Sequence, residues 1–466
     1  MAKLKIPSVA RYRKRVGGFG ALDVKHDGSV LQFNTAESCY NFDFGSGALD
    51  AGYGVADHPA VYFEAQRYWI YRYYSEEAGG YVDQCVFQEP HGLLMCYDSY
   101  EKELLYISGY WYPPIQAMNY RLNSKDVLLI SSEGNNLIVW DGYVLKSYES
   151  SPVISSMALH YERLFVTSRE EPTKVFFSDD LDPTNWDISA DGGGFIELLD
   201  ERGELNKVVS FGNYLYIFRD HGISRVTAFG DQREFSVTNL FMTAGRIFPS
   251  SIAVCGSCIL FLASDGLYMF DGYDCTRVLQ NLDGLIVPSD VCASMYYNGR
   301  YYLACRMNFD DGKKVGCEKG EYTTNGLLTY ATANGEYTIT RGIDITFMNS
   351  CTYLGEDLLM CCADGRGGVI EKCGKQFGES LPKFWKSPET DFGAPDRTKA
   401  IRELYIQSNA DCKVTLSSGK KTKTFKIKAG DRRVRVNFNA KRLSLAVESD
   451  APDCTVKAPT VVYSSY

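Results

Sequence analysis

Apolar and polar residues alternate along most of the chain, and short turn sequences interrupt the alternation. The pattern is clearest in residues 208–226 and 251–272, where three apolar strands are separated by two Gly-containing turns. A period of two places successive side chains on opposite faces of a strand, so these stretches predict antiparallel hairpins. The two copies lie roughly 44 residues apart, and a spacing of about 40–50 residues is typical of the blades of a β-propeller.

Other segments repeat the core of this pattern, which is a short strand, a polar turn and a strand of large apolar residues. They are residues 86–97, 122–132, 157–168, 295–306 and 351–365. The spacing of the units varies from roughly 35 to 57 residues, which indicates insertions. No apolar stripe with a period of 3.6 is sustained. The sequence therefore predicts an all-β fold containing a β-propeller of six or seven blades.

The two ends of the chain differ from the repeated middle. Residues 1–55 are predicted to form an extended basic N-terminal arm and a strand, and residues 56–395 to form the propeller. Residues 374–398, at the junction of the propeller with the segment that follows it, are rich in Pro and Gly, as in a linker. Residues 396–466 contain short alternating segments separated by turns, which predict a small basic C-terminal β-sandwich.

The composition supports this fold class and bears on the compartment in which the protein is made. The chain has 466 residues, of which 33 are Tyr and 25 are Phe, and aromatic residues favour strands. Most of the 15 cysteines lie in apolar strand patterns, which favours free thiols and a reducing site of synthesis. We find no signal-peptide pattern and no apolar run of the ~18 residues that a membrane span needs, so no membrane insertion is expected.

Charge is distributed unevenly along the chain. The formal net charge is −9, but residues 396–466 hold 15 Lys or Arg and 7 Asp or Glu and so carry +8, which leaves −17 on residues 1–395. The start of the arm is also basic. Such segments are either solvated surface or attachment points for acidic proteins or nucleic acid. The candidate residues for assembly or phosphate contact are Arg11, Arg13, Lys14, Arg15, Arg432, Arg433 and Arg435.

Residues 177–186 resemble the Asp-box of sialidase-type propellers. Ser178, Asp180, Thr184 and Trp186 match its usual pattern, whereas Asp182 stands where Gly is expected. Asp and Ser side chains bond backbone N–H groups in turns, and a Trp can anchor the turn on the blade. We therefore predict a structural turn built on Ser178, Asp180, Asp182 and Trp186, without a catalytic role.

No other motif predicts a reaction or a metal site. Cys255 and Cys258 form a lone CxxC pair at a predicted β-turn, whereas zinc would need a second pair or nearby His. His91, His160 and His221 are predicted to be surface residues at turns. A sialidase would need an arginine cluster, an acid and a Tyr, and no spacing selects such a set. We predict no catalytic residue, no metal and no cofactor, hence a protein that is not an enzyme.

Three segments of the chain also resemble a known family. Residues 175–187, 211–226 and 261–272, followed by a basic β-sandwich, resemble in content and order the β-propeller virion proteins of tailed bacteriophages. The likeness is greatest to the tail hub, stabilisation or nozzle proteins of short-tailed phages, and Gly17-Gly18 followed by Asn41-Phe42-Asp43 is similar to their openings. The family implies a ring of subunits, commonly hexameric, below the portal and adaptor and around a DNA channel.

The resemblance gives the first functional hypothesis. The protein is expected to be a structural part of a phage tail ring that joins the portal or adaptor to distal tail parts, anchors fibres and serves genome ejection. Its expected partners are copies of itself, other tail proteins and, non-specifically, phage DNA; it would be made in the host cytoplasm and reside in the virion. We expect the arm and the sandwich to dock on neighbours. The alternatives are a carbohydrate-binding or glycan-hydrolysing propeller and an intracellular scaffold of WD40 or kelch type.

Overall fold

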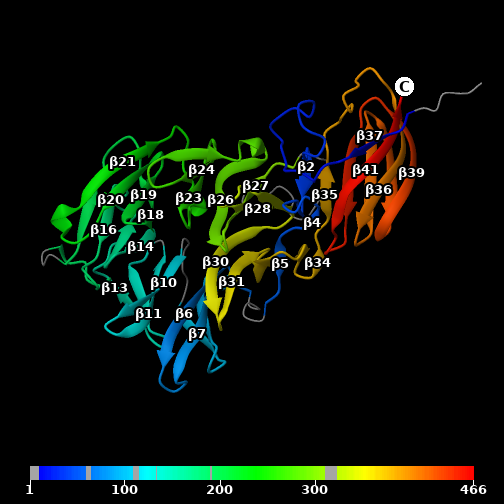
Figure 1. Ribbon diagram of the computed structural model, residues 1–466. Coiled ribbons are helices and arrows are strands. Elements are labelled where there is room, and N and C mark those ends of the chain that lie inside the picture. Colours follow the sequence, from blue (N-terminus) through cyan, green and yellow to red (C-terminus); the bar gives the residue numbers. More distant parts are fainter. Residues whose placement is uncertain (1–9, 59–63, 109–114, 133, 189–191, 310–322) are drawn as a thin grey trace, which may run out of the picture.

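In the computed structural model, antiparallel sheets follow one another from residue 54 to residue 371 and surround a common axis as the blades of a β-propeller (Figure 1). The structure describes residues 10–58, 64–108, 115–132, 134–188, 192–309 and 323–466. Within them the propeller has seven blades, so the predicted all-β propeller is confirmed at the upper of its two blade numbers. Each of the seven repeated sequence units lies in a different blade.

The first strand of each blade lies nearest the axis, since first strands of neighbouring blades contact one another, as β30 does with β6 and β26. Blade 1 contains β6 (Arg67–Ser75), β7 (Gly80–Gln88), β8 (Leu94–Asp98) and β9 (Leu104–Ser108). Blade 2 contains β10 (Ile115–Leu122), β11 (Lys125–Ser132), β12 (Leu137–Trp140) and β13 (Leu145–Tyr148). Blade 3 contains β14 (Ser156–His160), β15 (Arg163–Thr167), β16 (Lys174–Phe177) and β17 (Gly194–Glu197).

The remaining blades follow the same antiparallel order. Blade 4 contains β18 (Leu205–Phe211), β19 (Tyr214–Arg219), β20 (Gly222–Thr227) and β21 (Ser236–Met242), and blade 5 contains β22 (Ala253–Cys255), β23 (Cys258–Ala263), β24 (Gly266–Phe270) and β25 (Cys275–Val278). Blade 6 contains β26 (Ile286–Tyr297), β27 (Arg300–Met307), β28 (Gly326–Ala331) and β29 (Tyr337–Arg341). Blade 7 contains β30 (Ile345–Tyr353), β31 (Glu356–Ala363), β32 (Arg366–Glu371) and β5 (Gly54–Ala56). Short 3-10 turns lie at η2 (Gln232–Glu234), η3 (Pro249–Ser251) and η4 (Gln280–Leu282).

In blades 3 and 5 the second strand is buried along its whole length, because both of its faces pack against neighbouring blades. Every residue of β23 and of β15 is buried. A strand that is buried on both faces is apolar at successive positions instead of at alternate ones. This explains the unbroken apolar run of residues 258–263 in the sequence.

An N-terminal strand closes the ring of blades. Strand β5 pairs antiparallel with β32, which puts a segment from before blade 1 at the outer position of blade 7. The sheet continues through β33 (Lys375–Gln376) and β34 (Glu379–Ser380). Between the first strands, Asn349 Nδ2 donates to the carbonyl oxygen of Tyr68 at 3.1 Å. The blade sheets are thereby joined into a closed structure, which gives a propeller its rigidity.

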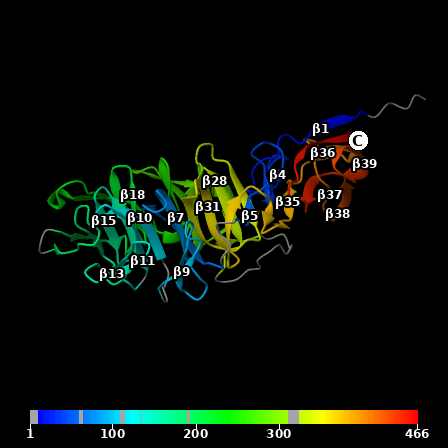
Figure 2. The same ribbon diagram turned by 90° about the horizontal axis from the view of Figure 1, so that it is seen from below.

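A β-sandwich lies at one end of the elongated molecule, beside blades 6 and 7 (Figures 1 and 2). One sheet has the order β1 (Tyr12–Arg15), β41 (Val456–Ser465), β36 (Lys399–Ser408) and β39 (Gly430–Ala440). The other has the order β2 (Ser38–Tyr40), β35 (Lys383–Lys386), β40 (Ser444–Ser449), β37 (Cys412–Ser418) and β38 (Lys421–Ile427). A small ribbon of β3 (Phe42–Asp43) and β4 (Asp50–Ala51) lies between the two bodies.

The division of the chain differs from the predicted boundaries of 1–55, 56–395 and 396–466. Strands β1 and β2 of the predicted arm segment belong to the sandwich, and β5 belongs to blade 7. The predicted linker contributes β35, an internal strand of the sandwich. These strands are short, and each has a partner hundreds of residues away, so local alternation carried no sign of the pairing.

The N-terminal segment between β1 and β5 ties the two bodies together. Residues 16–49 share one apolar core with blades 5 and 6 and with the sandwich. Phe19 packs edge-on against Trp385 of the sandwich, with ring centroids 4.7 Å apart. Asn41 Nδ2 donates to the Pro382 carbonyl oxygen at 2.8 Å, and Asn41 Oδ1 accepts from the backbone N–H of Arg341, in blade 6, at 2.7 Å. Sandwich and propeller are therefore joined by a packed core.

One buried histidine should make the stability of this fold depend on pH. His160 was predicted to be a surface residue but is only 2% exposed, and its Nδ1 lies 2.9 Å from Ser210 Oγ. Burial lowers the pKa of His160 to about 4 from 6.5, so the folded protein holds it neutral. As the pH falls below 6.5 the unfolded chain takes up a proton that the folded chain refuses until about pH 4, and stability falls through this window.

Between pH 7 and pH 4.5 we expect the free energy of unfolding of the wild type to fall by roughly 2–3 kcal/mol more than that of His160→Gln, at about 1.4 kcal/mol per pKa unit. Urea unfolding of both proteins at a series of pH values measures this difference. Parallel stability profiles for the two proteins would contradict it.

Candidate functional site

The turn between β16 and β17 is held by hydrogen bonds to β15 and within the turn. Ser178 is fully buried, and its Oγ accepts the backbone N–H of Leu164 at 3.0 Å. Arg163 Nη1 donates to the Ser178 carbonyl oxygen at 2.8 Å, and Arg163 Nε lies 2.8 Å from the carboxylate of Asp180. The first half of the turn is therefore fixed on β15 by both backbone and side-chain bonds.

The second half of the turn closes on itself. Asp182 Oδ1 accepts the backbone N–H of Thr184 at 2.9 Å and its hydroxyl at 2.6 Å. Trp186 is 8% exposed, packs in the core between blades 2 and 3, and donates its Nε1–H to the Pro183 carbonyl oxygen at 2.9 Å. These bonds leave the side chains engaged within the turn itself.

Trp186→Ala should destabilise the protein by about 3 kcal/mol or more, because it removes a large buried aromatic side chain and leaves a cavity. The matched control is Ile188→Ala, two residues further along, where the side chain is 56% exposed. Thermal unfolding of the two variants and the wild type measures the effect. If Trp186→Ala melts with the wild type, the anchoring role is wrong.

The predicted basic residues of the two chain ends meet on one sheet of the sandwich. The register of β1, β41, β36 and β39 places Arg13 and Arg435 in one row across this sheet. Arg15 and Arg433 share the neighbouring row, two positions along each strand and hence on the same face. All four are exposed. Residues more than 400 positions apart in the chain thus form one cationic surface.

A groove of about 560 Å³ follows this face. Its lining includes Tyr405 and Thr460 from the middle strands together with Arg15, Arg432, Arg433 and Lys457, and one carboxylate, that of Asp431. We call the surface formed by Arg13, Arg15, Arg432, Arg433, Arg435 and Lys457 the basic face.

The predicted residues contribute unequally to the basic face. Arg433 is bound by Glu403, with Nε 3.1 Å from Oε2, and this guanidinium lowers the pKa of the Glu403 carboxyl. Arg11 precedes β1, and its charge also acts on Glu403. Lys14 alternates with Arg13 and Arg15 and so points to the other side of the strand. Sequence reasoning missed Lys457, because its place beside Gln407 of β36 depends on the sheet order.

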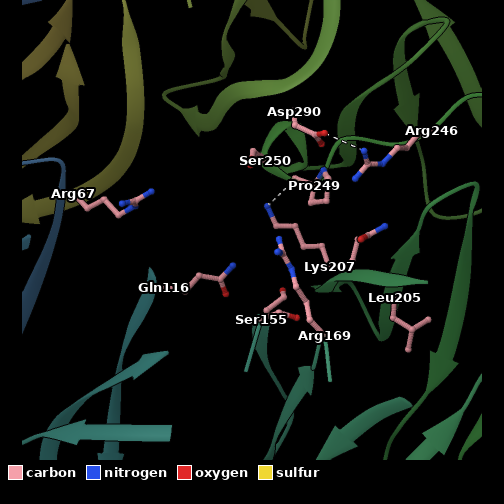
Figure 3. Close-up of a pocket in the computed structure, with 12 residues that line it drawn as sticks. Arg67, Gln116, Ser155, Arg169, Leu205, Lys207, Arg246, Pro249, Ser250 and Asp290 are labelled. Carbon is pink, nitrogen blue, oxygen red and sulfur yellow. Dashed lines mark hydrogen bonds and ion pairs between the residues drawn. The ribbon is translucent and has the colours of Figure 1, made fainter. Parts of the chain in front are cut away.

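A second basic site lies at one mouth of the propeller axis (Figure 3). A cavity of about 580 Å³ is lined there mostly by residues at or near the start of the inner strands of blades 1 to 6, and by Arg169 from the loop after β15. They are Arg67, Gln116, Ser155, Ser156, Arg169, Leu205, Asn206, Lys207, Arg246, Pro249, Ser250 and Asp290. We call it the axial cavity. No sequence pattern indicated it, because its residues are single positions spread over more than 200 residues.

The polar groups of the axial cavity are mostly cationic. Lys207 Nζ donates to the carbonyl oxygens of Pro249 at 3.1 Å and Ile252 at 2.8 Å, and burial lowers the pKa of this lysine to about 8. Arg246 Nη1 lies 3.0 Å from Asp290 Oδ2, the one carboxylate of the lining. Glycoside hydrolysis usually needs two carboxylates. The described lining is therefore suited to binding an anion and does not supply that pair.

The CxxC pair lies at the ends of two strands. Cys255 and Cys258 face each other across the β22–β23 turn, both are buried, and burial raises the pKa of each thiol. All described cysteines carry free thiols, and no group of three or more potential metal ligands occurs among the described residues. A search of the same residues for a helix long and apolar enough to cross a membrane also finds none.

Comparisons with known proteins find similarity among solved structures. No protein-family model and no curated protein matches the chain. Among solved structures, the chain is similar to BBS1N from its complex with ARL6DN, with a TM-score of 0.40 and 10% identity over 69% of this chain and 95% of that one. It is also similar to Hsv2p of Kluyveromyces lactis, with a TM-score of 0.32 and 10% identity over 55% of this chain and 81% of that one.

Proposed function

We propose that the protein is a non-enzymatic structural subunit of a ring in the tail of a short-tailed bacteriophage. The observation that carries the proposal is the basic face, which joins the two predicted basic segments into one exposed surface. This surface lies at one end of a chain whose residues 1–395 carry −17. The sequence resemblance to phage tail hub, stabilisation and nozzle proteins supplies the setting.

The charge distribution favours contacts between unlike ends of neighbouring subunits. Exposed Glu170, Glu201 and Glu204 lie in the connections around β16 to β18, at the end of the propeller away from the sandwich (Figure 1). A basic face that meets such an acidic surface of the next subunit makes a heterologous contact, and repetition of that contact closes into a ring. Complementary charges also select the correct partner and speed encounter.

The connection between the two bodies suits a rigid ring. A ring subunit must hold its two contact surfaces at a fixed distance and angle. The shared core of residues 16–49 and the closure of blade 7 by β5 fix the sandwich on the propeller. Since β1 pairs with β41 of its own chain, the contact to a neighbour is made by the outer side of the sandwich sheet and does not require a free arm.

The test is the protein composition of purified phage particles from the source of the gene. Quantitative mass spectrometry should find the chain at a fixed number of copies per portal ring, in particles with tails and not in tailless heads. Its absence from tailed particles, with the chain present in the lysate, would refute the proposal.

A further inference from the structure

The axial cavity brings positive charge from several blades to one point. Arg67 comes from blade 1, Arg169 from the loop after β15, and Lys207 from blade 4. In Figure 3 Arg67 extends into the space from one side, and the charged ends of Arg169 and Lys207 point into it from another. Arg246 adds a fourth cation, and Asp290 is the single carboxylate. The lining therefore has an excess of positive charge.

Two of these cations are held in place by groups that do not neutralise them. The two bonds of Lys207 Nζ go to backbone carbonyls, and an ammonium group has a third N–H to donate. Arg67 Nη1 donates to the amide oxygen of Gln88 at 3.0 Å. Among the described residues, neither Lys207 nor Arg67 has a carboxylate within 4.0 Å.

Burial of these charges costs free energy in the unliganded protein. Burial lowers the pKa of both Lys207 and Arg67, which means that the surroundings disfavour their charged forms. An anion bound between the two side chains would stabilise their charged forms and so offset the cost of burial. The strength of such charge-assisted bonds increases as water is excluded.

We propose that the axial cavity binds a small soluble polyphosphate, a compound of the size of a nucleotide or less that carries two or more phosphate groups. The cavity volume of about 580 Å³ lies within the ~300–1,000 Å³ of small-molecule sites, and a nucleic-acid duplex is far larger. Arginine pairs with phosphate oxygens through two parallel N–H bonds, and lysine adds a point charge. Gln116, Asn206 and Ser250 add neutral polar residues to the lining. This site is separate from the basic face and does not depend on the ring.

Isothermal titration calorimetry of the full chain with inorganic tripolyphosphate tests the proposal. We expect one site per chain, and at least tenfold weaker binding by Lys207→Met and by Arg67→Gln. The matched control is Arg121→Gln, on an exposed side chain at the β10–β11 turn, and it should bind as the wild type does. Thermal unfolding without ligand identifies any variant that fails to fold. If one cavity variant does not fold, the binding affinity of the other cavity variant tests the proposal.

Two further measurements test whether the bound phosphate compound occupies the axial cavity and whether nucleic acid competes for the same site. Arg15→Gln, on the basic face, should bind tripolyphosphate like the wild type, and a short single-stranded DNA should not displace tripolyphosphate. No binding by the wild type, or binding that both cavity variants retain, would overturn the proposal. Binding that is lost only in Arg15→Gln, or that DNA displaces, would also overturn it, because the site would then be the basic face or a nucleic-acid site.

Discussion

Reversing three charges of the basic face, with Arg13→Glu, Arg15→Glu and Arg435→Glu together, should weaken incorporation into the ring about 100-fold. The three side chains are exposed, so the fold should tolerate the change. Each reversal turns an attraction worth up to about 1 kcal/mol into a repulsion. A combined loss of about 3 kcal/mol corresponds to roughly two powers of ten in affinity. Complementation of a deletion phage and counting of the copies per particle measures the effect.

The control triple is Lys420→Glu, Lys421→Glu and Lys426→Glu, at the hairpin of β37 and β38 in the other sandwich sheet. It changes the net charge by the same amount on side chains that are also exposed. We expect it to incorporate normally. An equal loss of incorporation in both triple variants would mean that incorporation depends on the net charge of the protein and not on the basic face. Raising the salt concentration should weaken the wild-type contact, because exposed charges are screened.

Trp385→Ala should have the largest effect on stability, a loss of roughly 4 kcal/mol, within the ~3–5 kcal/mol known for buried Trp and Phe. Trp385 is fully buried, and its strand β35 lies between β2 and β40. The side chain also packs on Phe19, so its loss opens the contact that ties the N-terminal segment to the sandwich. We therefore expect the sandwich to unfold before the propeller, as two transitions.

Circular dichroism during urea unfolding, combined with limited proteolysis, follows both bodies. Proteolysis should release residues of the sandwich first. The control is Trp385→Phe, which keeps most of the packing and should cost less than half as much. A single transition with an unchanged midpoint in Trp385→Ala would contradict the role of this core.

Local signals in the sequence account for the blades. The hairpin of residues 208–226 carries its alternation, its turn residues and its buried strand within 19 positions, and its strands pair in that order. The Asp-box-like turn is local in the same way, because Ser178, Asp182 and Trp186 bond to groups within about 15 residues. Each of these elements specifies its own partners, so alternation and turn chemistry are sufficient to predict it.

The parts of the fold that sequence reasoning did not predict depend on pairing between strands that lie far apart in the chain. Strand β5 has three residues and joins β32 more than 300 positions later, and β1 joins β41 across more than 440. Which partner such a short strand takes depends on the shape of the assembled sheets and not on its own few residues. The axial cavity is a further case, because Arg67 and Lys207 meet only after the blades have closed around the axis.

An electron cryo-microscopy map of the phage tail, with this chain placed in it, would decide whether the protein forms the proposed ring. We expect a closed ring in which the basic face of each sandwich meets the acidic propeller surface of the next subunit, with Arg13, Arg15 and Arg435 at the contact. A ring in which these arginines face open solvent, or a tail in which the chain forms no ring, would refute the proposed assembly.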